Sequence, residues 1–274
     1  GHRRLARPAA AEGPLSDGAL KLIEEAWAGL NPAKVLDTHV HIVGIGVGGT
    51  GCFVSERMRS WASPVEHLKY TLYEAAAGVE DTEKCDAQYV ERLVSLLRSQ
   101  KPHGRALIFA FEQLHDEQGR AVKEASEFFT PNDYVLGLAK NYPDIFVPCA
   151  SIHPYRPDAV EALEKAVAQG AVAVKWLPNA MNIHPGDAKC DAFYEALQRL
   201  QVPLITHAGE EKAVHAEALQ RLGNPLHLRR PLEHGVTVVV AHCAALGTNP
   251  DLDTGLAEPP SVDTFALFLR LMNE

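Results

Sequence analysis

The chain has 274 residues, of which 46% are hydrophobic and 22% charged, and its formal net charge is −9. This composition is typical of a globular protein with a large core. The negative charge argues against a nucleic-acid partner, which requires a clustered basic face, and no apolar run approaches the roughly 18 residues of a membrane span. Five widely spaced cysteines without a C-x-x-C pair favour reduced thiols and a cytoplasmic protein.

Residues 1–33 predict an amino-terminal tail followed by a helix. Residues 1–15 are rich in Ala, Arg and Pro, as loose tails are. Ser16 is a suitable cap for a helix that runs to about Gly29. Residues 34–274 then predict one α/β domain.

Six apolar runs in this domain have the length of β-strands. They are continuous rather than alternating, which is typical of strands covered on both faces. Helical patterns lie between them, most clearly at Asp158–Gln169 and Asp187–Leu200, and a last helix is expected at Ser261–Glu274. The alternation predicts a parallel sheet with helices outside. The six runs are Val35–Val43, Arg105–Phe111, Ile145–His153, Ala171–Leu177, Val202–His207 and Val236–His242.

Polar residues at the carboxyl ends of these runs distinguish a closed barrel from an open sheet. In a barrel, all carboxyl ends open onto one mouth, so residues distant in sequence converge there. We therefore predict a (β/α)8 TIM-type barrel with about six recognisable βα units. The strand-end residues are His39, His41, His153, Lys175, His207 and His242.

The histidines at the strand ends predict a metal site. His39 and His41 are two residues apart on a strand, so both point to the same face. Two imidazoles a few ångströms apart suit one divalent ion, although buried, hydrogen-bonded histidines would give the same pattern. His207 and His242 follow two further apolar strands, which strengthens the metal hypothesis.

Lys175 lies inside the apolar run Ala171–Leu177, where an ammonium is costly to bury unless it is paired or neutralised. It is either a salt-bridged pocket residue or a carboxylated lysine that bridges two metal ions. His153 and Glu210 are candidate substrate-binding residues. For His153 a structural role is equally consistent with the sequence.

The segment 44–49 matches G-x-G-x-x-G and follows a strand, so a dinucleotide site has to be considered. That motif must open a helix and precede an acidic residue at the end of a second strand. Here an irregular stretch to Pro64 follows instead. We interpret the segment as a loop next to the metal site.

The combination of His39-x-His41, Lys175, His207 and His242 resembles the amidohydrolase superfamily of metal-dependent (β/α)8 hydrolases. Lys175–Ala180 and Thr206–Glu210 are similar to the fourth and fifth strands of its dihydroorotases, and the long loops resemble the amidohydrolase-2 branch. The resemblance implies one or two divalent ions, most often zinc, held by the four histidines. It also implies a carboxylated Lys175 where two ions bind.

The implied activity is hydrolysis of an amide, cyclic amide, lactone or ester bond of a small molecule by metal-activated water, with His242 and Lys175 in catalytic positions. A metal-dependent non-oxidative decarboxylase and a metal-binding pseudoenzyme are the alternatives. The sequence leaves the substrate and a homo-oligomeric state open.

One element of the superfamily pattern is missing, the aspartate that ends the eighth strand. Asp251, Asp253 and Asp263 fall in a loop and at a helix start instead. A barrel filled by side chains needs about eight strands. We therefore expect the barrel to be incomplete at the carboxyl terminus, with two further strands beyond Glu274.

Overall fold

The computed structural model describes residues 15–56, 79, 81–99, 102–212 and 217–274. The chain divides into two compact units. Unit 1 comprises Gly1–Ile108 and Leu138–Val147, and unit 2 comprises Phe109–Gly137 and Pro148–Glu274. The predicted tail, apart from Leu15, lies outside the described residues.

Unit 1 contains helix α1 (Asp17–Trp27), strand β1 (Leu36–His41), helix α4 (Cys85–Ser99) and strand β3 (Arg105–Phe109). Helix α1 begins where the sequence predicts, because the Ser16 hydroxyl accepts a hydrogen bond from the backbone N–H of Ala19. The short elements of this unit are η1 (Pro32–Lys34), η2 (Val47–Gly49), β2 (Phe53–Val54) and η3 (Thr82–Lys84).

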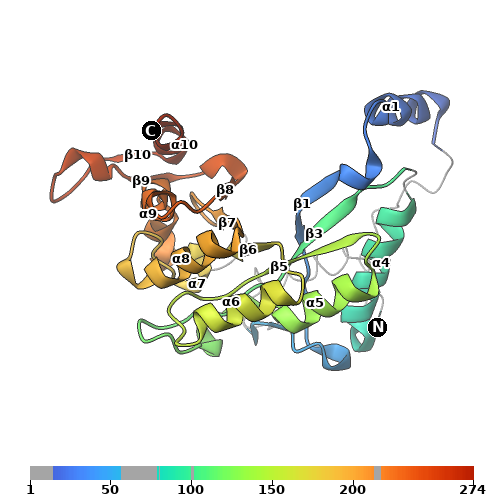
Figure 1. Cartoon of the computed structure of the whole chain (residues 1–274), viewed down its shortest axis with the longest axis horizontal. Helices are drawn as coiled ribbons and strands as arrows, with labels where there is room; N and C mark the ends of the chain where they lie inside the picture. The colour runs from blue at the N-terminus through green and yellow to red at the C-terminus, as the bar shows by residue number, and fades with distance from the viewer. Residues whose placement is uncertain (1–14, 57–78, 80, 100–101, 213–216) are drawn as a thin grey trace, which may run out of the picture. The chain divides into compact units, whose positions relative to one another are not determined.

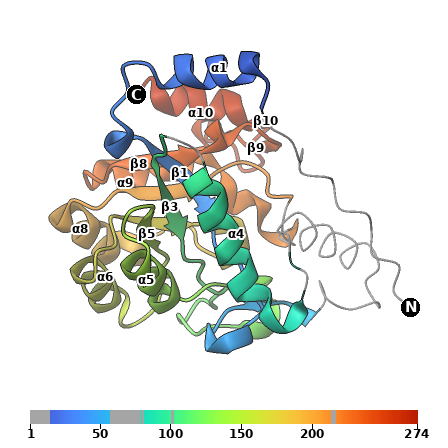
Figure 2. The ribbon, with the colours of Figure 1, turned by 90° about the vertical axis from the view of Figure 1, so that its right-hand side faces the viewer.

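The glycine-rich segment after β1 folds around a buried carboxylate. Asp86, in the first turn of α4, is 1% exposed and accepts hydrogen bonds from the backbone N–H of Ile45 (2.8 Å) and Gly46 (3.0 Å) and from the Thr50 hydroxyl. A Cβ at Gly44 would lie 2.3 Å from an Asp86 carboxylate oxygen, so this position requires glycine. Helix α4 therefore packs against the segment through η2, as Figure 2 shows. Asp86 occupies the N–H groups that a dinucleotide phosphate would need.

In unit 2, strands β6 (Ala173–Trp176), β7 (Leu204–His207) and β8 (Val238–Ala241) are parallel and follow one another in chain order. The carboxyl half of β5 (Phe146–Ala150) pairs with β6 in the same direction. Every residue of β6 and β7 is buried. As a result, any polar side chain in these two strands is desolvated.

Helices α6 (Ala159–Ala168) and α8 (Asp191–Leu200) pack against each other beside these strands (Figure 1). Fully buried Leu163, Phe193 and Trp176 belong to the core that they share with the sheet. The other elements are η4 (Lys123–Ala125), β4 (Phe128–Phe129), α5 (Asn132–Asn141), α7 (Pro178–Met181), η5 (Ala188–Cys190), η6 (Glu217–Gly223), η7 (Pro225–Leu228), α9 (Arg229–Glu233), η8 (His242–Ala244), β9 (Thr248–Pro250), η9 (Leu252–Thr254), β10 (Ser261–Asp263) and α10 (Thr264–Met272).

All six predicted runs contain a strand of the parallel sheet, whose order is β1-β3-β5 in unit 1 and β5-β6-β7-β8 in unit 2. This is the order of a partial (β/α)8 barrel and confirms the predicted fold class. The expected last helix begins later than predicted, because Ser261–Asp263 pairs antiparallel with β9 before α10 starts. The first turn of the helix predicted at Asp187 is the 3-10 turn η5.

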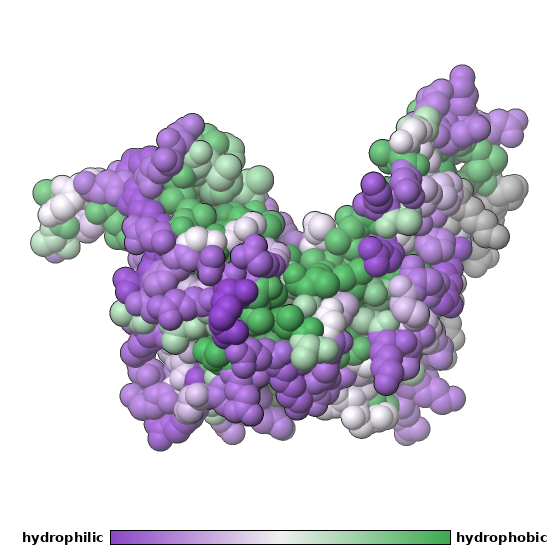
Figure 3. All heavy atoms as spheres, viewed as in Figure 1, coloured by the Kyte–Doolittle hydropathy of each residue, from purple (hydrophilic) through white to green (hydrophobic). Residues whose placement is uncertain are grey.

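Apolar side chains gather on the surface over α10, shown in green in Figure 3. The predicted apolar stripe of this helix, Phe265, Leu269 and Met272, is exposed, whereas Leu267 and Leu271 are buried. The helix therefore has two apolar faces, and the described residues of unit 2 cover one of them.

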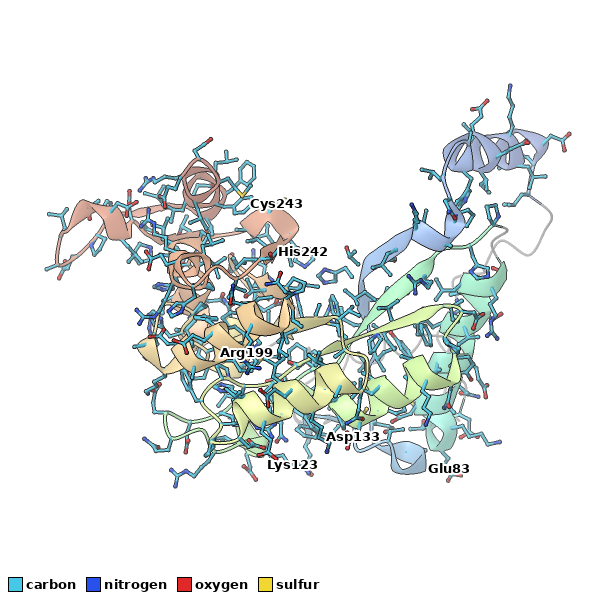
Figure 4. All side chains as sticks on the ribbon, in the orientation of Figure 1. Glu83, Lys123, Asp133, Arg199, His242 and Cys243 are labelled. Atoms are coloured by element: carbon cyan, nitrogen blue, oxygen red, sulfur yellow. The ribbon has the colours of Figure 1, made fainter. Side chains whose placement is uncertain are left out.

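We predict that Asp86→Asn lowers the free energy of unfolding by about 2–4 kcal/mol. The amide nitrogen of the asparagine would face a group that donates a hydrogen bond to the carboxylate in the wild type, and it cannot accept that hydrogen bond. The measurement is urea unfolding at pH 7. Glu83→Gln, which removes the same charge from an exposed side chain nearby (Figure 4), is the control and should change stability by less than about 0.5 kcal/mol. Equal midpoints for the two variants would contradict the assignment.

Candidate functional site

His39 and His41 end strand β1 in unit 1 and lie on the same face, as the alternation predicts. Their Nε2 atoms are 3.2 Å apart and their ring centroids 5.2 Å apart. Two nitrogen ligands of one tetrahedral zinc ion, each at 2.0–2.1 Å, are about 3.3 Å apart. The spacing therefore fits a shared cation, and it also fits an N–H···N hydrogen bond. The backbone is fixed here because the Tyr89 hydroxyl donates to the His41 carbonyl oxygen (2.6 Å).

Lys175 is the polar residue inside β6 of unit 2 and is 2% exposed. Burial lowers the pKa of its amine from 10.5 to about 8, against the charges of Cys149 and Glu211, which raise it. Its Nζ lies 5.3 Å from the centre of the Phe109 ring. Among the described residues, no carboxylate forms a salt bridge with Lys175, so the salt-bridged alternative gains no support.

His207 ends β7 and lies on the same side of the sheet as Lys175. The parallel register pairs Lys175 with Ile205, and His207 is two residues further along that strand. Its Nε2 is buried and has no hydrogen-bond partner within the described part of the chain. Burial, together with the charges of Lys175 and His242, lowers the pKa of His207 from 6.5 to about 4. The ring is therefore neutral at pH 7, with a lone pair available to a ligand.

His242 follows β8, whose last residue, Ala241, pairs with His207. Strand alternation would turn the next side chain to the opposite face, but His242 has φ = +58° and begins the left-handed turn η8. Its ring centroid lies 5.8 Å from that of His207. Figure 4 shows His242 and Cys243 together on this exposed turn. The left-handed backbone therefore brings the His242 ring close to the His207 ring.

The two acids after His207 differ in their surroundings. Glu210 is 39% exposed at its side chain and lies 3.3 Å from the Lys212 ammonium. The Glu211 side chain is 10% exposed, and its Oε2 is 3.7 Å from Nδ1 of His207. Both acids are plausible pocket residues from the sequence, which favours Glu210 for substrate binding, and the structure places Glu211 beside the histidine. The backbone at Gly209 has φ = +93° and turns the chain so that Glu211 lies beside His207. This glycine is the sequence signal that could have indicated the turn.

His153 is fully buried after β5, and both of its ring nitrogens are engaged. Nε2 lies 2.9 Å from the carbonyl oxygen of Met181, and Nδ1 accepts the backbone N–H of Tyr155 (3.2 Å). The ring stacks on His115 at 4.3 Å. Burial lowers the pKa of His153 to about 3. These contacts favour the structural role over substrate binding.

The three carboxyl-terminal aspartates are engaged in structural contacts. Asp251 and Asp253 both pair with Arg270, with oxygen–nitrogen distances of 2.7 Å. Asp263 lies at the start of helix α10, as predicted, and caps it by accepting the N–H of Ala266, but it also ends the short strand β10, which the sequence did not indicate. Strand β10 is not part of the parallel sheet, so Asp263 is not equivalent to a barrel-strand aspartate.

Within either unit, the described residues do not bring three or more His, Cys, Asp or Glu side chains together as a ready-made metal site. The candidate site residues in unit 1 are His39 and His41, and those in unit 2 are Lys175, His207, His242 and Glu211. In the described part of the chain, no helix is long and apolar enough to cross a membrane.

Comparison with known proteins identifies a family. The sequence profile of the amidohydrolase family matches residues 36–258. No curated protein matches the sequence.

Solved structures show the fold. An uncharacterised TIM-barrel protein from Bordetella bronchiseptica is 17% identical, with a TM-score of 0.50 over 75% of this chain and 66% of its own. A probable 2-pyrone-4,6-dicarboxylic acid hydrolase from Acinetobacter baumannii, with citric acid bound, is 17% identical, with a TM-score of 0.49 over 86% of this chain and 65% of its own. A 5-carboxyvanillate decarboxylase from Novosphingobium aromaticivorans, with bound manganese, is 15% identical, with a TM-score of 0.45 over 76% and 66%. The chain thus spans slightly less than two thirds of their lengths.

We predict that His153→Leu destabilises the protein at pH 7 by about 2–4 kcal/mol, because the Met181 carbonyl and the Tyr155 N–H lose their partner. It should also flatten the dependence of stability on pH. The native pKa, about 3, is below the unfolded value near 6.5. The unfolded state therefore binds the extra proton, and stability falls as pH decreases from about 6.5 to about 3, by up to about 1.4 kcal/mol per pH unit.

The measurement is urea unfolding at pH 5 and at pH 7 for both proteins. The stability difference between wild type and variant should be smaller at pH 5. A variant as stable as the wild type at both pH values would rule out the structural role.

Proposed function

The chain belongs to the amidohydrolase family, and we propose that it is a metal-dependent hydrolase of an amide, cyclic amide, lactone or ester bond in a small molecule. The observation that carries the proposal is that the buried Nε2 of His207 has no hydrogen-bond partner among the residues that the structure describes. A buried nitrogen without a partner costs about 1–3 kcal/mol. A divalent cation that accepts its lone pair would remove that cost.

We assign four histidines as residues that bind divalent cations: His39 and His41 of unit 1, and His207 and His242 of unit 2. The donor set supports this assignment, because neutral imidazoles suit zinc and other transition metals. The 3.2 Å spacing of the His39 and His41 Nε2 atoms is compatible with one such ion. Zinc is the metal we propose first, since neutral histidine nitrogens predominate.

Lys175 would act as an anionic ligand after carboxylation. An amine attacks CO2 only in its neutral form, and burial increases the neutral fraction of Lys175 near pH 8. The nitrogen forms a bond to the carbon of CO2 and releases one proton, which leaves a carbamate. An ammonium in the same place would repel a cation, so carboxylation also removes an unfavourable charge.

When bound, the cation would lower the pKa of a water and polarise the carbonyl of the substrate. His242, exposed at its turn, would donate a hydrogen bond to the developing oxyanion or add a further nitrogen to the cation. Glu210, the more exposed of the two acids, would face the small-molecule substrate. Asp251, Asp253 and Asp263 are engaged elsewhere, so we assign none of them as the general acid.

We predict that protein purified without chelator contains zinc, manganese or iron, measured by elemental analysis. His39→Gln and His207→Gln should each lower the metal content at least tenfold, because each removes a nitrogen ligand. His103→Gln, at a histidine outside the proposed set, should leave it unchanged. The release of an alcohol or amine from a panel of esters, lactones and amides then tests hydrolysis. Release of CO2 from aromatic carboxylates would instead identify the decarboxylase.

Full metal content in both ligand variants would contradict the assignment of these histidines. A metal-loaded protein that is inactive on all panels would support the pseudoenzyme.

We predict that Lys175→Ala lowers the metal content from two ions per chain to one, because the bridging anion is lost. Acetate or propionate should partly restore the second ion. Wild type given 13C-bicarbonate should show a carbamate resonance that Lys175→Ala lacks. Lys189→Ala, at an exposed lysine, is the control. One ion per chain in the wild type, without a carbamate signal, would show that Lys175 remains an amine.

A further inference from the structure

His207 can bind a cation through Nε2 only if the ring carries its proton on Nδ1. A neutral imidazole protonates one nitrogen, and the hydrogen bond made by that nitrogen selects the tautomer. The unpartnered Nε2 therefore raises the question of which group receives the Nδ1 proton. Nδ1 faces the side chain of Glu211, four residues further along the chain.

Glu211 is the acid that faces this nitrogen. Its Oε2 is 3.7 Å from Nδ1 of His207, which is a charge contact longer than a hydrogen bond, and both side chains are about nine-tenths buried. The negative charge beside Nδ1 favours the tautomer that carries its proton there. The carboxylate lies on the Nδ1 side of the ring, and the two ring nitrogens point in different directions. Glu211 is therefore placed to orient the imidazole rather than to share the ligand that Nε2 would bind.

The position of Glu211 is fixed by an amide side chain from η6. Gln220 Oε1 accepts the backbone N–H of Glu211, and Gln220 Nε2 donates to the carbonyl oxygen of Glu211, both at 2.9 Å. The Gln220 carboxamide thus bonds both the N–H and the C=O of Glu211, as a neighbouring β-strand would, and fixes the backbone of this residue. Glu211 consequently depends on the orientation of one carboxamide.

A second amide, that of Asn179, fixes this orientation. Asn179 is fully buried in α7, and its Nδ2 donates to Gln220 Oε1 (2.9 Å) and to the carbonyl oxygen of Gly209 (3.1 Å). Gly223 packs against it, since a Cβ there would lie 2.8 Å from Nδ2. Its Oδ1 has no partner among the described residues. The amide is therefore oriented with Nδ2, and not Oδ1, toward Gln220 and Gly209.

We infer that Glu211, held by the Asn179–Gln220 amide pair, is a positioning residue that keeps His207 in the Nδ1-protonated tautomer with Nε2 free to bind a divalent cation. The inference rests on the proposed function for the cation and on the described contacts for the tautomer. Asn179 follows the strand of Lys175, and Glu211 follows the strand of His207. The amide pair therefore also couples the two strand ends that carry candidate ligands.

Two variants test this inference. Glu211→Gln keeps the size of the side chain but removes the acceptor charge, and Glu210→Gln removes the same charge one residue away. In protein with 15N-labelled histidine and without metal, we expect His207 to be an Nδ1–H tautomer in the wild type and in Glu210→Gln. In Glu211→Gln we expect a shift toward Nε2–H. The resonances are assigned by their loss in His207→Gln.

The second readout is zinc affinity, measured by competition with a chromogenic chelator. Glu211→Gln should weaken binding about 10–100-fold, the usual cost of losing such a partner. Glu210→Gln should change it less than about threefold. Gln220→Met, which cannot pair with the Glu211 backbone, should weaken binding in the same direction as Glu211→Gln. Failure of the wild type to bind zinc would reject the proposed function. The tautomer is measured without metal, so the tautomer result would still test this inference.

The inference is overturned if Glu211→Gln matches Glu210→Gln in both tautomer and affinity. It is also overturned if Glu211→Gln abolishes zinc binding while the tautomer stays unchanged, because Glu211 would then be a ligand itself.

Discussion

Burial of polar groups at the carboxyl ends of two parallel strands is the constraint on which the chemistry of unit 2 depends. The register of β6 against β7 places Lys175 and His207 on one side of the sheet, in two strands whose residues are all buried. Burial favours the uncharged forms of both groups, with pKa values lowered to about 8 and about 4. A neutral amine and a neutral imidazole are polar and therefore costly to bury in a hydrophobic core, but each has a lone pair that can bind an electrophile. Burying two such groups lowers the stability of the core, and under the proposed function a ligand would offset this loss.

Unit 1 solves a related problem in a different way. The backbone N–H groups of the segment after β1 are turned inward, and Asp86 supplies the acceptor that they need. These donors are satisfied within the protein, so the segment carries no requirement for a ligand. The two histidines at the end of β1 face each other, with their Nε2 atoms 3.2 Å apart. Near this strand end, Asp86 therefore stabilises the backbone, whereas His39 and His41 are the candidate ligands.

The strands and the strand-end histidines were predictable because they depend on local patterns. An apolar run of five to nine residues indicates a buried strand wherever it packs, and alternation places His39 and His41 on one face. The choice between Glu210 and Glu211 was not predictable, since it depends on the positive φ of Gly209 and on Gln220 from a later turn. The structural contacts of His153 depend on Met181 and His115, which are distant in sequence. The short strand that ends at Asp263 needs its partner β9, which no apolar run announces.

The turn after β8 shows how packing sustains the local strain at this end of unit 2. His242, Cys243 and Ala244 all have φ between 50° and 58°, a conformation that costs non-glycine residues roughly 1–2 kcal/mol each. Ala244 is fully buried, and a Cβ on Gly209 would approach its backbone at 3.3–3.4 Å. The left-handed turn therefore packs closely against the Gly209 turn. Because one carries His242 and the other leads to Glu211, the packing that holds the strain also sets the two neighbours of His207.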